Sequence, residues 1–303
     1  MPEAPSSPYL EAVLAGDRVR YARKVMPLRD GEDLFPWQIA MLSSESKRKI
    51  GDCSRQAGKS SVVAPIATHT VKYRRGSLVI VQASTLQQAS WDMSKIKQCI
   101  SRDPTFPKLV RESDSLIEDE YGGRIEVIPA TEKSAQGASA PAVIILDEAS
   151  DIDDEVVSAG VIPMLTGNEE CELILISTPH GRTGFFFRAF HNPEWERYLV
   201  RSPFLPVNGT TLEEFMPEAQ FIAQQTERGV KAWYSPRHSS LKQQTEQLLL
   251  MGMRLYLQEQ CAEFVEPEEQ IFSYDDIAAA ANAADLVPNL SSDIAVEDIP
   301  VLE

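Results

Sequence analysis

The sequence predicts an α/β fold in which a mostly parallel central sheet is flanked by helices, with a small helical lid subdomain added. Short apolar segments alternate with longer stretches of helical spacing, a pattern typical of parallel strands joined by crossover helices. Two of the apolar segments, AVIIL and LILI, are typical of strands buried on both faces. At 303 residues and 43% hydrophobic content, the chain can bury the core of one large domain and an appendage.

Five segments are expected to form strands, and two longer ones to form crossover helices. The strands are expected at residues 49–53, 77–83, 124–128, 142–146 and 172–177. The first of them, KIGDC, is poor in β-branched residues and is inferred from its context alone. Residues 59–73 and 87–101 have the length and apolar spacing of helices, and each can serve as a right-handed crossover.

The character of the chain changes after residue 203, where a polar, proline-containing stretch precedes a helical pattern over residues 239–264. We therefore expect residues 1–203 to form the core and residues 204–265 to form a helical lid or linker subdomain. Residues 266–303 are expected to be an acidic tail, in which the alanine-rich segment 277–284 can be helical.

The net charge of −16, from 45 acidic and 29 basic residues, argues against a surface that coats nucleic acid with uniform positive charge. Eleven of the acidic residues and no Lys or Arg fall in residues 262–303, so the rest of the chain is nearer neutral and can hold local basic patches. The candidate patches are Lys72, Arg74 and Arg75, and a second group of Arg228, Lys231, Arg237 and Lys242. A solvated face is the competing interpretation of each.

The four cysteines, Cys53, Cys99, Cys171 and Cys261, are far apart and show no metal-ligand spacing. This distribution argues against a zinc site or a disulfide framework and fits a reducing compartment. No apolar run reaches the roughly 18 residues that span a bilayer, and the N-terminus lacks the apolar segment of a secretory signal. We therefore expect a soluble, intracellular protein.

A phosphate-binding loop of the Walker A kind is predicted between the first strand and the first crossover helix. Backbone N–H groups at such a strand–helix turn form an anion site, Lys59 would pair with the β and γ phosphates, and the Ser60 hydroxyl would ligate Mg²⁺. The leading glycine of the strict motif is replaced by Cys53, so an ordinary surface helix start is the alternative. The predicted ATP-binding residues of the loop are Ser54, Arg55, Gln56, Ala57, Gly58, Lys59 and Ser60.

Two carboxylates, Asp147 and Glu148, follow the buried strand AVIIL directly, as in a Walker B motif. The carboxyl edge of such strands is where ligands bind in open α/β sheets. Asp147 would hold Mg²⁺ through water, and Glu148 would orient and deprotonate the attacking water. An acidic helix cap is the alternative for this pair alone, but its occurrence together with the phosphate loop favours an NTPase.

Two further segments border the same predicted site. Ser177, Thr178 and Pro179 follow the strand ELILIS and place hydroxyls near the γ-phosphate, although an ordinary turn is the simpler interpretation. The segment Phe35-Pro36-Trp37-Gln38, about twenty residues before the loop, offers an aromatic face and an amide that can bind the adenine edge, and Trp37 and Gln38 are its predicted ATP-binding residues. A core position is the alternative for Trp37.

Together these motifs resemble the ATPase domain of the large terminase subunit of tailed bacteriophages, over about residues 34–264. Few families combine two of these features. The first is a phosphate loop that starts with cysteine and contains Arg-Gln, and the second is a Ser-Thr-Pro segment that continues to Phe185-Phe186. The segments that carry the resemblance are Pro36-Trp37-Gln38, Ser54-Arg55-Gln56 before Gly58-Lys59-Ser60, Ile145-Leu146-Asp147-Glu148-Ala149, Ile176-Ser177-Thr178-Pro179 with Gly181-Arg182-Thr183-Gly184-Phe185-Phe186, and Tyr256-Leu257-Gln258-Glu259-Gln260.

The resemblance implies an ATP- and Mg²⁺-dependent motor that pumps double-stranded DNA into a procapsid. Arg55 would contact ATP or couple its hydrolysis to movement, with a solvated loop arginine as the alternative, and Ser177-Thr178-Pro179 would be the coupling motif. Lys59, Arg55 and Glu148 would be the catalytic residues. The family also implies a homo-oligomeric ring, a portal protein and a small terminase subunit as partners, and a location in the host cytoplasm, transiently at the portal vertex, with no membrane.

The sequence departs from the family in two respects. Many relatives carry an arginine shortly before the Asp-Glu strand that reaches a neighbouring subunit, whereas this chain has Gln136-Gly137. Either Arg124 or Arg182 would take that role, or ATPase activity would be weak. Relatives also continue into a nuclease domain, so residues 266–303 would be a linker towards a domain that is absent from this chain. The aspartates of residues 266–303 are interpreted as charges exposed to solvent.

Two other functions remain open. A helicase or restriction-type translocase shares the adenine-reading glutamine and the Asp-Glu pair, but needs a second motor domain for which the chain has no room. A nucleotide-gated DNA-binding or scaffold protein would use ATP only to order its oligomer. DNA-stimulated phosphate release would distinguish a motor from such a scaffold.

Overall fold

The computed structural model describes residues 8–29, 31–130, 140–236 and 240–266. Apart from residue 266, they belong to one compact unit, residues 1–265. The helices are α1 (Pro8–Ala15), α2 (Arg18–Val25), α3 (Pro36–Ser43), η1 (Lys59–Ser61), α4 (Val63–Tyr73), α5 (Leu86–Ser101), η2 (Ala149–Asp151), α6 (Asp154–Val156), η3 (Val157–Val161), α7 (Ile162–Thr166), α8 (Gly184–His191), α9 (Glu218–Glu227) and α10 (Leu241–Glu259). The strands are β1 (Arg48–Cys53), β2 (Leu78–Ala83), β3 (Leu109–Glu112), β4 (Leu116–Asp119), β5 (Arg124–Pro129), β6 (Val143–Asp147), β7 (Glu172–Ser177), β8 (Glu196–Arg201), β9 (Phe204–Asn208), β10 (Thr211–Glu214) and β11 (Val230–Tyr234).

The central sheet has the strand order β11-β8-β1-β7-β6-β2-β5-β4-β3, and β9 and β10 form a separate hairpin. The strands from β11 to β5 run parallel, whereas β4 and β3 extend one edge in antiparallel fashion. The five predicted strands correspond to β1, β2, β5, β6 and β7. The expected fold class, a mostly parallel sheet flanked by helices, is therefore confirmed.

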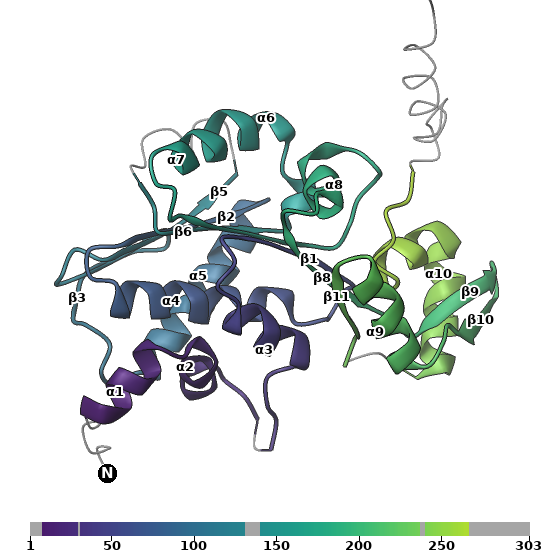
Figure 1. The fold of residues 1–303 in the computed structure, drawn as a ribbon, viewed down its shortest axis with the longest axis horizontal. Coiled ribbons are helices and arrows are strands. Elements are labelled where there is room, and N and C mark those ends of the chain that lie inside the picture. Colours follow the sequence, from purple (N-terminus) through teal and green to yellow (C-terminus); the bar gives the residue numbers. More distant parts are fainter. Residues whose placement is uncertain (1–7, 30, 131–139, 237–239, 267–303) are drawn as a thin grey trace, which may run out of the picture. The chain divides into compact units, whose positions relative to one another are not determined.

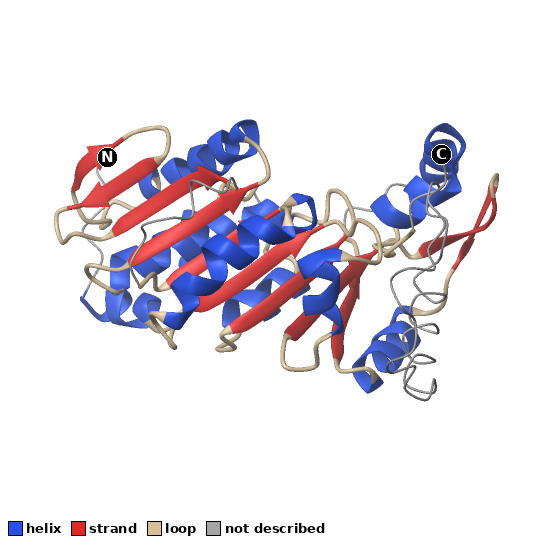
Figure 2. Ribbon diagram, turned by 90° about the horizontal axis from the view of Figure 1, so that it is seen from above, coloured by secondary structure: helices blue, strands red, loops and turns tan. Residues whose placement is uncertain are grey.

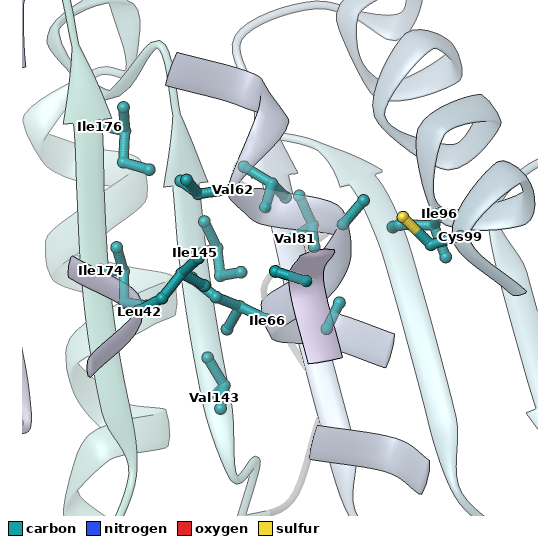
Figure 3. Close-up of a cluster of buried hydrophobic side chains, with 14 of the residues drawn as sticks. Leu42, Val62, Ile66, Val81, Ile96, Cys99, Val143, Ile145, Ile174 and Ile176 are labelled. Atoms are coloured by element: carbon teal, nitrogen blue, oxygen red, sulfur yellow. The ribbon is translucent and has the colours of Figure 1, made fainter. Parts of the chain in front are cut away.

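Helices cover both faces of the sheet (Figure 1), and a view from above shows the strands running between them (Figure 2). The two predicted crossover helices, α4 and α5, lie on one face with α1–α3, and α6–α8 lie on the other. Figure 3 shows the first face, where Ile174 and Ile176 of β7 and Val143 and Ile145 of β6 pack with Ile66 of α4. The alternate residues of β6 and β7 belong to the cluster on the second face. Both strands are thus buried on both faces, as expected.

Residues 204–265 are not wholly helical, which corrects the prediction of a helical lid. They begin with the β9–β10 hairpin, and β11 pairs in parallel with β8, so the central sheet extends past residue 203. The predicted helix over residues 239–264 is α10, which ends at Glu259. Gly252 has φ 79° and ψ 163° and interrupts it, because a residue without a Cβ adopts this conformation at little cost. The hairpin is mostly exposed, so its strands lack a strong apolar pattern.

Several predictions concern residues outside the described part of the chain: the helix at residues 277–284, Gln136, and Arg237 of the second basic patch. Among the described helices, none combines the length and apolar character needed to cross a bilayer.

Candidate functional site

The carboxyl ends of β1, β7 and β6 lie side by side at one edge of the sheet. In the parallel registers, Asp52 of β1 pairs with Ser177 of β7, and Ile176 of β7 pairs with Asp147 of β6. The phosphate loop, the Ser-Thr-Pro segment and the acidic pair therefore start from neighbouring points. The structure brings together the three motifs that the sequence places after separate strands, at the edge where ligands bind in open α/β sheets.

The phosphate loop leaves β1 in regular strand geometry and turns sharply later. Cys53 ends β1 without a positive φ, so its position does not require glycine, and burial raises the pKa of its thiol. It is a small core side chain and not a nucleophile. Positive φ values occur at Gln56 (61°) and Gly58 (83°). The φ of Gly58 favours glycine, and a Cβ there would lie 2.8 Å from Nε2 of Gln38, so a larger residue would also displace the Gln38 amide that holds the loop.

Helix α3 holds the loop through Trp37 and Gln38. The indole Nε1–H of Trp37 donates to the Ala57 carbonyl at 3.0 Å, and Nε2 of Gln38 donates to the Gly58 carbonyl at 3.0 Å. Trp37 is 0% exposed, so the prediction that its face meets an adenine is wrong; it is a core residue. Gln38 borders a cavity beside the loop, and so does Phe35, the other aromatic residue of the predicted adenine-binding segment.

A cleft of about 550 Å³ lies over the loop. It is lined by the predicted residues Arg55, Gln56, Gly58, Lys59, Ser60, Glu148 and Thr178, and also by Ser61, Gln88, Trp91, Lys95, Asp151, His180 and Glu259. The side chains of Ser54 and Ala57 are buried and do not line it. A second cavity of about 440 Å³ shares Gly58, Ser61, Trp91 and Lys95 with the cleft and continues towards Phe35, Gln38 and Leu28.

Lys59 joins the three motifs. Its Nζ donates to Oε2 of Glu148 at 3.2 Å and to the Thr178 hydroxyl, and its side chain is only 9% exposed. Glu148 has φ 51° and ψ 48°, a left-handed conformation that is uncommon outside glycine and concentrates at functional sites. This backbone turn directs the Glu148 side chain towards Lys59 while Asp147 stays in the strand.

Asp147 is fully buried behind the cleft wall and does not line the cleft. Gln88 of α5, which does line it, donates from Nε2 to Oδ2 of Asp147 at 2.9 Å. Asp92, one turn further along α5, is also buried; burial, followed by the negative charge of Asp147, raises its pKa. Neither Gln88 nor Asp92 was predicted to belong to the site, although their spacing of four residues places them on one face of the predicted helix.

Arg55 connects the loop to the end of α10. Its backbone N–H donates to the Glu259 carbonyl at 2.7 Å, and its Nε pairs with the Glu259 carboxylate. The Arg55 side chain is 69% exposed, so the pair lies at the open side of the cleft. Arg55 is therefore exposed, as the alternative of a solvated loop arginine predicts, but it also fastens the phosphate loop to Glu259 of α10.

The turn after β6 is fastened to the turn after β7. The Ser150 hydroxyl lies 2.6 Å from the Ser177 hydroxyl, and the Ser150 N–H donates to the same Ser177 oxygen at 3.1 Å. Next along, Nδ1 of His180 pairs with Oδ1 of Asp151, and this hydrogen bond raises the pKa of His180. The sequence analysis did not select either residue.

The predicted basic patches are only partly available. Lys72 is buried and paired with Glu11 and Asp103, so it is not a DNA contact. Arg75 lies over the Tyr121 ring at 4.0 Å, and Lys231 pairs with Glu196.

The residues at the cleft fit a magnesium nucleotide. The described part of the chain contains no group of three or more His, Cys, Asp or Glu side chains that could hold a metal ion by itself. A metal ion here would therefore take most ligands from phosphate oxygens and water, as Mg²⁺ commonly does. The Ser60 hydroxyl in the cleft and the Asp147 carboxylate behind it supply the hard oxygen donors that Mg²⁺ prefers.

No protein-family model matches the sequence. Two structures of the large terminase ATPase domain of Thermus phage P74-26, one of them a point mutant, each give a TM-score of 0.56. They are 21% and 20% identical and cover 78% of this chain and 96% and 95% of theirs. The large terminase of bacteriophage HK97 gives a TM-score of 0.51 at 13% identity, and the match covers 90% of this chain but 52% of that one. The chain therefore has the fold of phage large terminase ATPase domains, as its motifs predict.

Proposed function

We propose that this chain is the ATPase motor of a terminase large subunit, which hydrolyses ATP to move DNA into a viral procapsid. The observation that carries the proposal is the position of the Lys59 ammonium, which contacts Glu148 and Thr178 at the wall of the cleft. A lysine, a carboxylate and a hydroxyl from three successive motifs thus meet where a phosphate loop presents its backbone N–H groups.

The two cavities suggest how ATP binds. The phosphates would lie in the cleft against Gly58, Lys59 and Ser60. The base would enter the adjoining cavity, where Phe35 offers an aromatic face and Gln38 an amide edge. The cavity and the cleft share four lining residues, Gly58, Ser61, Trp91 and Lys95, so they adjoin, and one extended ligand would reach from the cleft into the cavity.

Hydrolysis would use the Glu148 carboxylate as the base. Phosphate oxygens compete with that carboxylate for the Lys59 ammonium, so ATP binding frees Glu148 to orient and deprotonate a water molecule. Ser60 and Asp147 would hold Mg²⁺, which neutralises phosphate charge when bound. Because Asp147 is covered by Gln88, its contact with the ion's water shell requires the Gln88 side chain to turn aside.

Movement would be transmitted through Arg55, which links the phosphate loop to α10, and through Thr178, which links Lys59 of the loop to the segment after β7. Arg55 can exchange the Glu259 carboxylate at the end of α10 for a phosphate oxygen, which would loosen α10 from the loop. Thr178, in the coupling segment Ser177-Thr178-Pro179, contacts Lys59 directly and would register loss of the γ-phosphate.

The proposal includes the partners and location that the resemblance implies. These are double-stranded DNA, a portal protein, a small terminase subunit and further copies of this chain in a ring. The motor would work in the host cytoplasm, transiently at the portal vertex. DNA would be gripped by its phosphates, without base recognition.

The test is phosphate release by the purified chain, with and without linear double-stranded DNA. We expect ATP turnover that DNA stimulates, and a loss of about 10²-fold or more in Glu148→Gln with ATP binding retained. Glu227→Gln, an exposed position on α9, is the matched control and should behave as wild type.

A wild-type chain that binds ATP without turnover, even with DNA and packaging partners, would make it a nucleotide-gated scaffold and not a motor. Turnover that persists in Glu148→Gln would assign the base to another residue.

A further inference from the structure

A histidine–aspartate pair lies in the wall of the cleft and has no role in the function proposed above. Nδ1 of His180 pairs with Oδ1 of Asp151, and both residues line the cleft together with Lys59, Ser60 and Glu148. Their side chains are 42% and 41% exposed, so a ligand in the cleft can reach them. The pair is therefore accessible, unlike His69, which is buried under α1.

The position of His180 along the chain keeps it close to the lysine of the phosphate loop. Thr178, which contacts Lys59, is only two residues before His180, a span of at most about 7 Å between their Cα atoms. Asp151 is likewise three residues after Glu148, and its N–H donates to the Glu148 carbonyl at 3.0 Å. Both members of the pair thus come from the turns that carry the contacts of Lys59.

These turns are held in one arrangement. Ser150, next to Asp151, bonds to the Ser177 hydroxyl and to the Thr178 carbonyl. The His180 ring is fixed in turn, because Nδ1–H donates to the Asp151 carboxylate and leaves Nε2 as the nitrogen available to a ligand. An imidazole oriented by a carboxylate in this manner is a preorganised hydrogen-bond donor.

We propose that His180 contacts the terminal phosphate of the bound nucleotide through Nε2–H, and that Asp151 is its positioning residue. This inference rests on the proposed ATPase function and adds a cationic contact to it. Lys59 would bind the phosphate chain from the loop side, and His180 from the turn after β7. The contact would exist for a triphosphate and be lost for a diphosphate.

The charge of His180 gives the contact a pH dependence with a definite sign. The groups that face it are Asp151 from η2, Glu259 at the end of α10 and Glu148 after β6. The hydrogen bond to Asp151 and the charges of all three carboxylates favour the imidazolium and raise its pKa, although partial burial opposes them. The cations that line the same cleft are each paired with a carboxylate: Lys59 with Glu148, Arg55 with Glu259 and Lys95 with Asp92. As the pH rises through the raised pKa of His180, the imidazolium is lost and the affinity for the terminal phosphate should fall.

The experiment measures the affinity of the chain for ATPγS and for ADP, both with Mg²⁺, by calorimetry between pH 5.5 and 8.5. His180→Ala should weaken ATPγS binding about 10- to 100-fold, the usual size of a charge-assisted hydrogen bond. It should leave ADP affinity within about a factor of three. His180→Arg should retain ATPγS affinity without the pH dependence, and Asp151→Asn should move the dependence to lower pH.

His191→Gln is the matched control, because its ring packs against Phe187 on α8 and does not line the cleft. It should bind both nucleotides as the wild type does. If the wild type binds ATPγS but His180→Ala binds it equally well with an unchanged pH profile, the role of His180 is wrong while the proposed function stands. If the wild type binds no nucleotide, the proposed function itself fails. Equal losses for ATPγS and ADP would show a structural role and would also overturn the inference.

Discussion

Two buried lysines with different surroundings flank most of β1 and the phosphate loop: Lys49 is the second residue of the strand, and Lys59 lies in η1, six residues after Cys53. Lys49, near the amino end, is fully buried; its Nζ lies 2.5 Å from Oε1 of Glu172 and 2.8 Å from the Ser44 carbonyl. Glu172 is also held by two hydrogen bonds from Arg18, so its carboxylate is saturated by protein groups. Lys59, beyond the carboxyl end, pairs with Glu148, whose side chain is 29% exposed in the cleft wall.

The difference separates a structural ion pair from a functional one. At Lys49, the ammonium and the Glu172 carboxylate are both held by protein atoms. Removal of the carboxylate would leave the charges of Lys49 and Arg18 without a partner inside the protein. At Lys59, the partners face a cleft, so a ligand can replace them without breaking the core. Burial of a lysine–glutamate pair therefore does not indicate a functional site. A pair whose carboxylate faces a cleft does, because a ligand can reach it.

The largest effect is expected from Lys59→Ala. Loss of the ammonium removes the charge that binds the phosphates and stabilises the transition state, so ATP turnover should fall about 10³-fold or more. Stability should change little, because Glu148 can turn towards water in the cleft. Phosphate release and urea unfolding measure the two quantities on the same preparation. Residual turnover above about a tenth of wild type would show that Lys59 is as structural as Lys49.

The opposite result is expected for Glu172→Gln. It leaves the charges of Lys49 and Arg18 without a carboxylate, and breaking a buried pair costs about 3–5 kcal/mol of unfolding free energy. Turnover per folded molecule should stay near wild type, since Glu172 lies at the other end of the sheet strands from the cleft. A matched control is Glu170→Gln, because Glu170 pairs with Lys47 at the surface and should cost less than about 1 kcal/mol.

The loss of stability in Glu172→Gln should depend on pH. Burial alone would raise the pKa of Glu172, but its hydrogen bonds to Arg18 and the charges of Arg18 and Lys49 lower it below the ordinary 4.5. The stabilisation from a carboxylate with a lowered folded-state pKa is complete above 4.5 and is lost as the pH falls through the folded value. The stability difference between wild type and Glu172→Gln should therefore shrink below about pH 4.5. A difference that does not change with acid would refute this account.

Much of the fold was predictable from local patterns. The segments AVIIL and LILI are apolar at every residue, and such runs form strands with both faces covered. Strands β3, β4, β8, β9, β10 and β11 were missed, because they lie at or next to sheet edges or in a hairpin, or carry charged residues such as Arg197 and Arg201 that long-range pairs accommodate. Those pairs form between residues far apart in sequence and leave no local periodicity.

The candidate site was predictable where residues follow strand ends, and unpredictable where they come from helices. Lys59, Glu148 and Thr178 each follow a strand, so parallel topology brings them together. Gln88 and Asp92 interact with Asp147 from the first two turns of the crossover helix α5, and His180 gains significance only from the Asp151 carboxylate beside it. Trp37 was placed near the loop but assigned to the ligand, since sequence cannot show on which side of the loop a side chain lies.

The smallest effect is expected from Trp37→Phe, which tests this correction. Phenylalanine fills most of the buried space but loses the hydrogen bond from Nε1 to the Ala57 carbonyl, at a cost of about 1–2 kcal/mol of unfolding free energy. ATP affinity should fall only severalfold, because a less firmly held loop still presents Lys59. Phe35→Ala supplies the contrast: it should weaken ATP binding more than it lowers stability, since Phe35 borders the second cavity. If Trp37→Phe instead weakened ATP binding about 100-fold with stability intact, Trp37 would contact the ligand as Lys59 does. Its buried side chain would then have to become exposed when nucleotide binds.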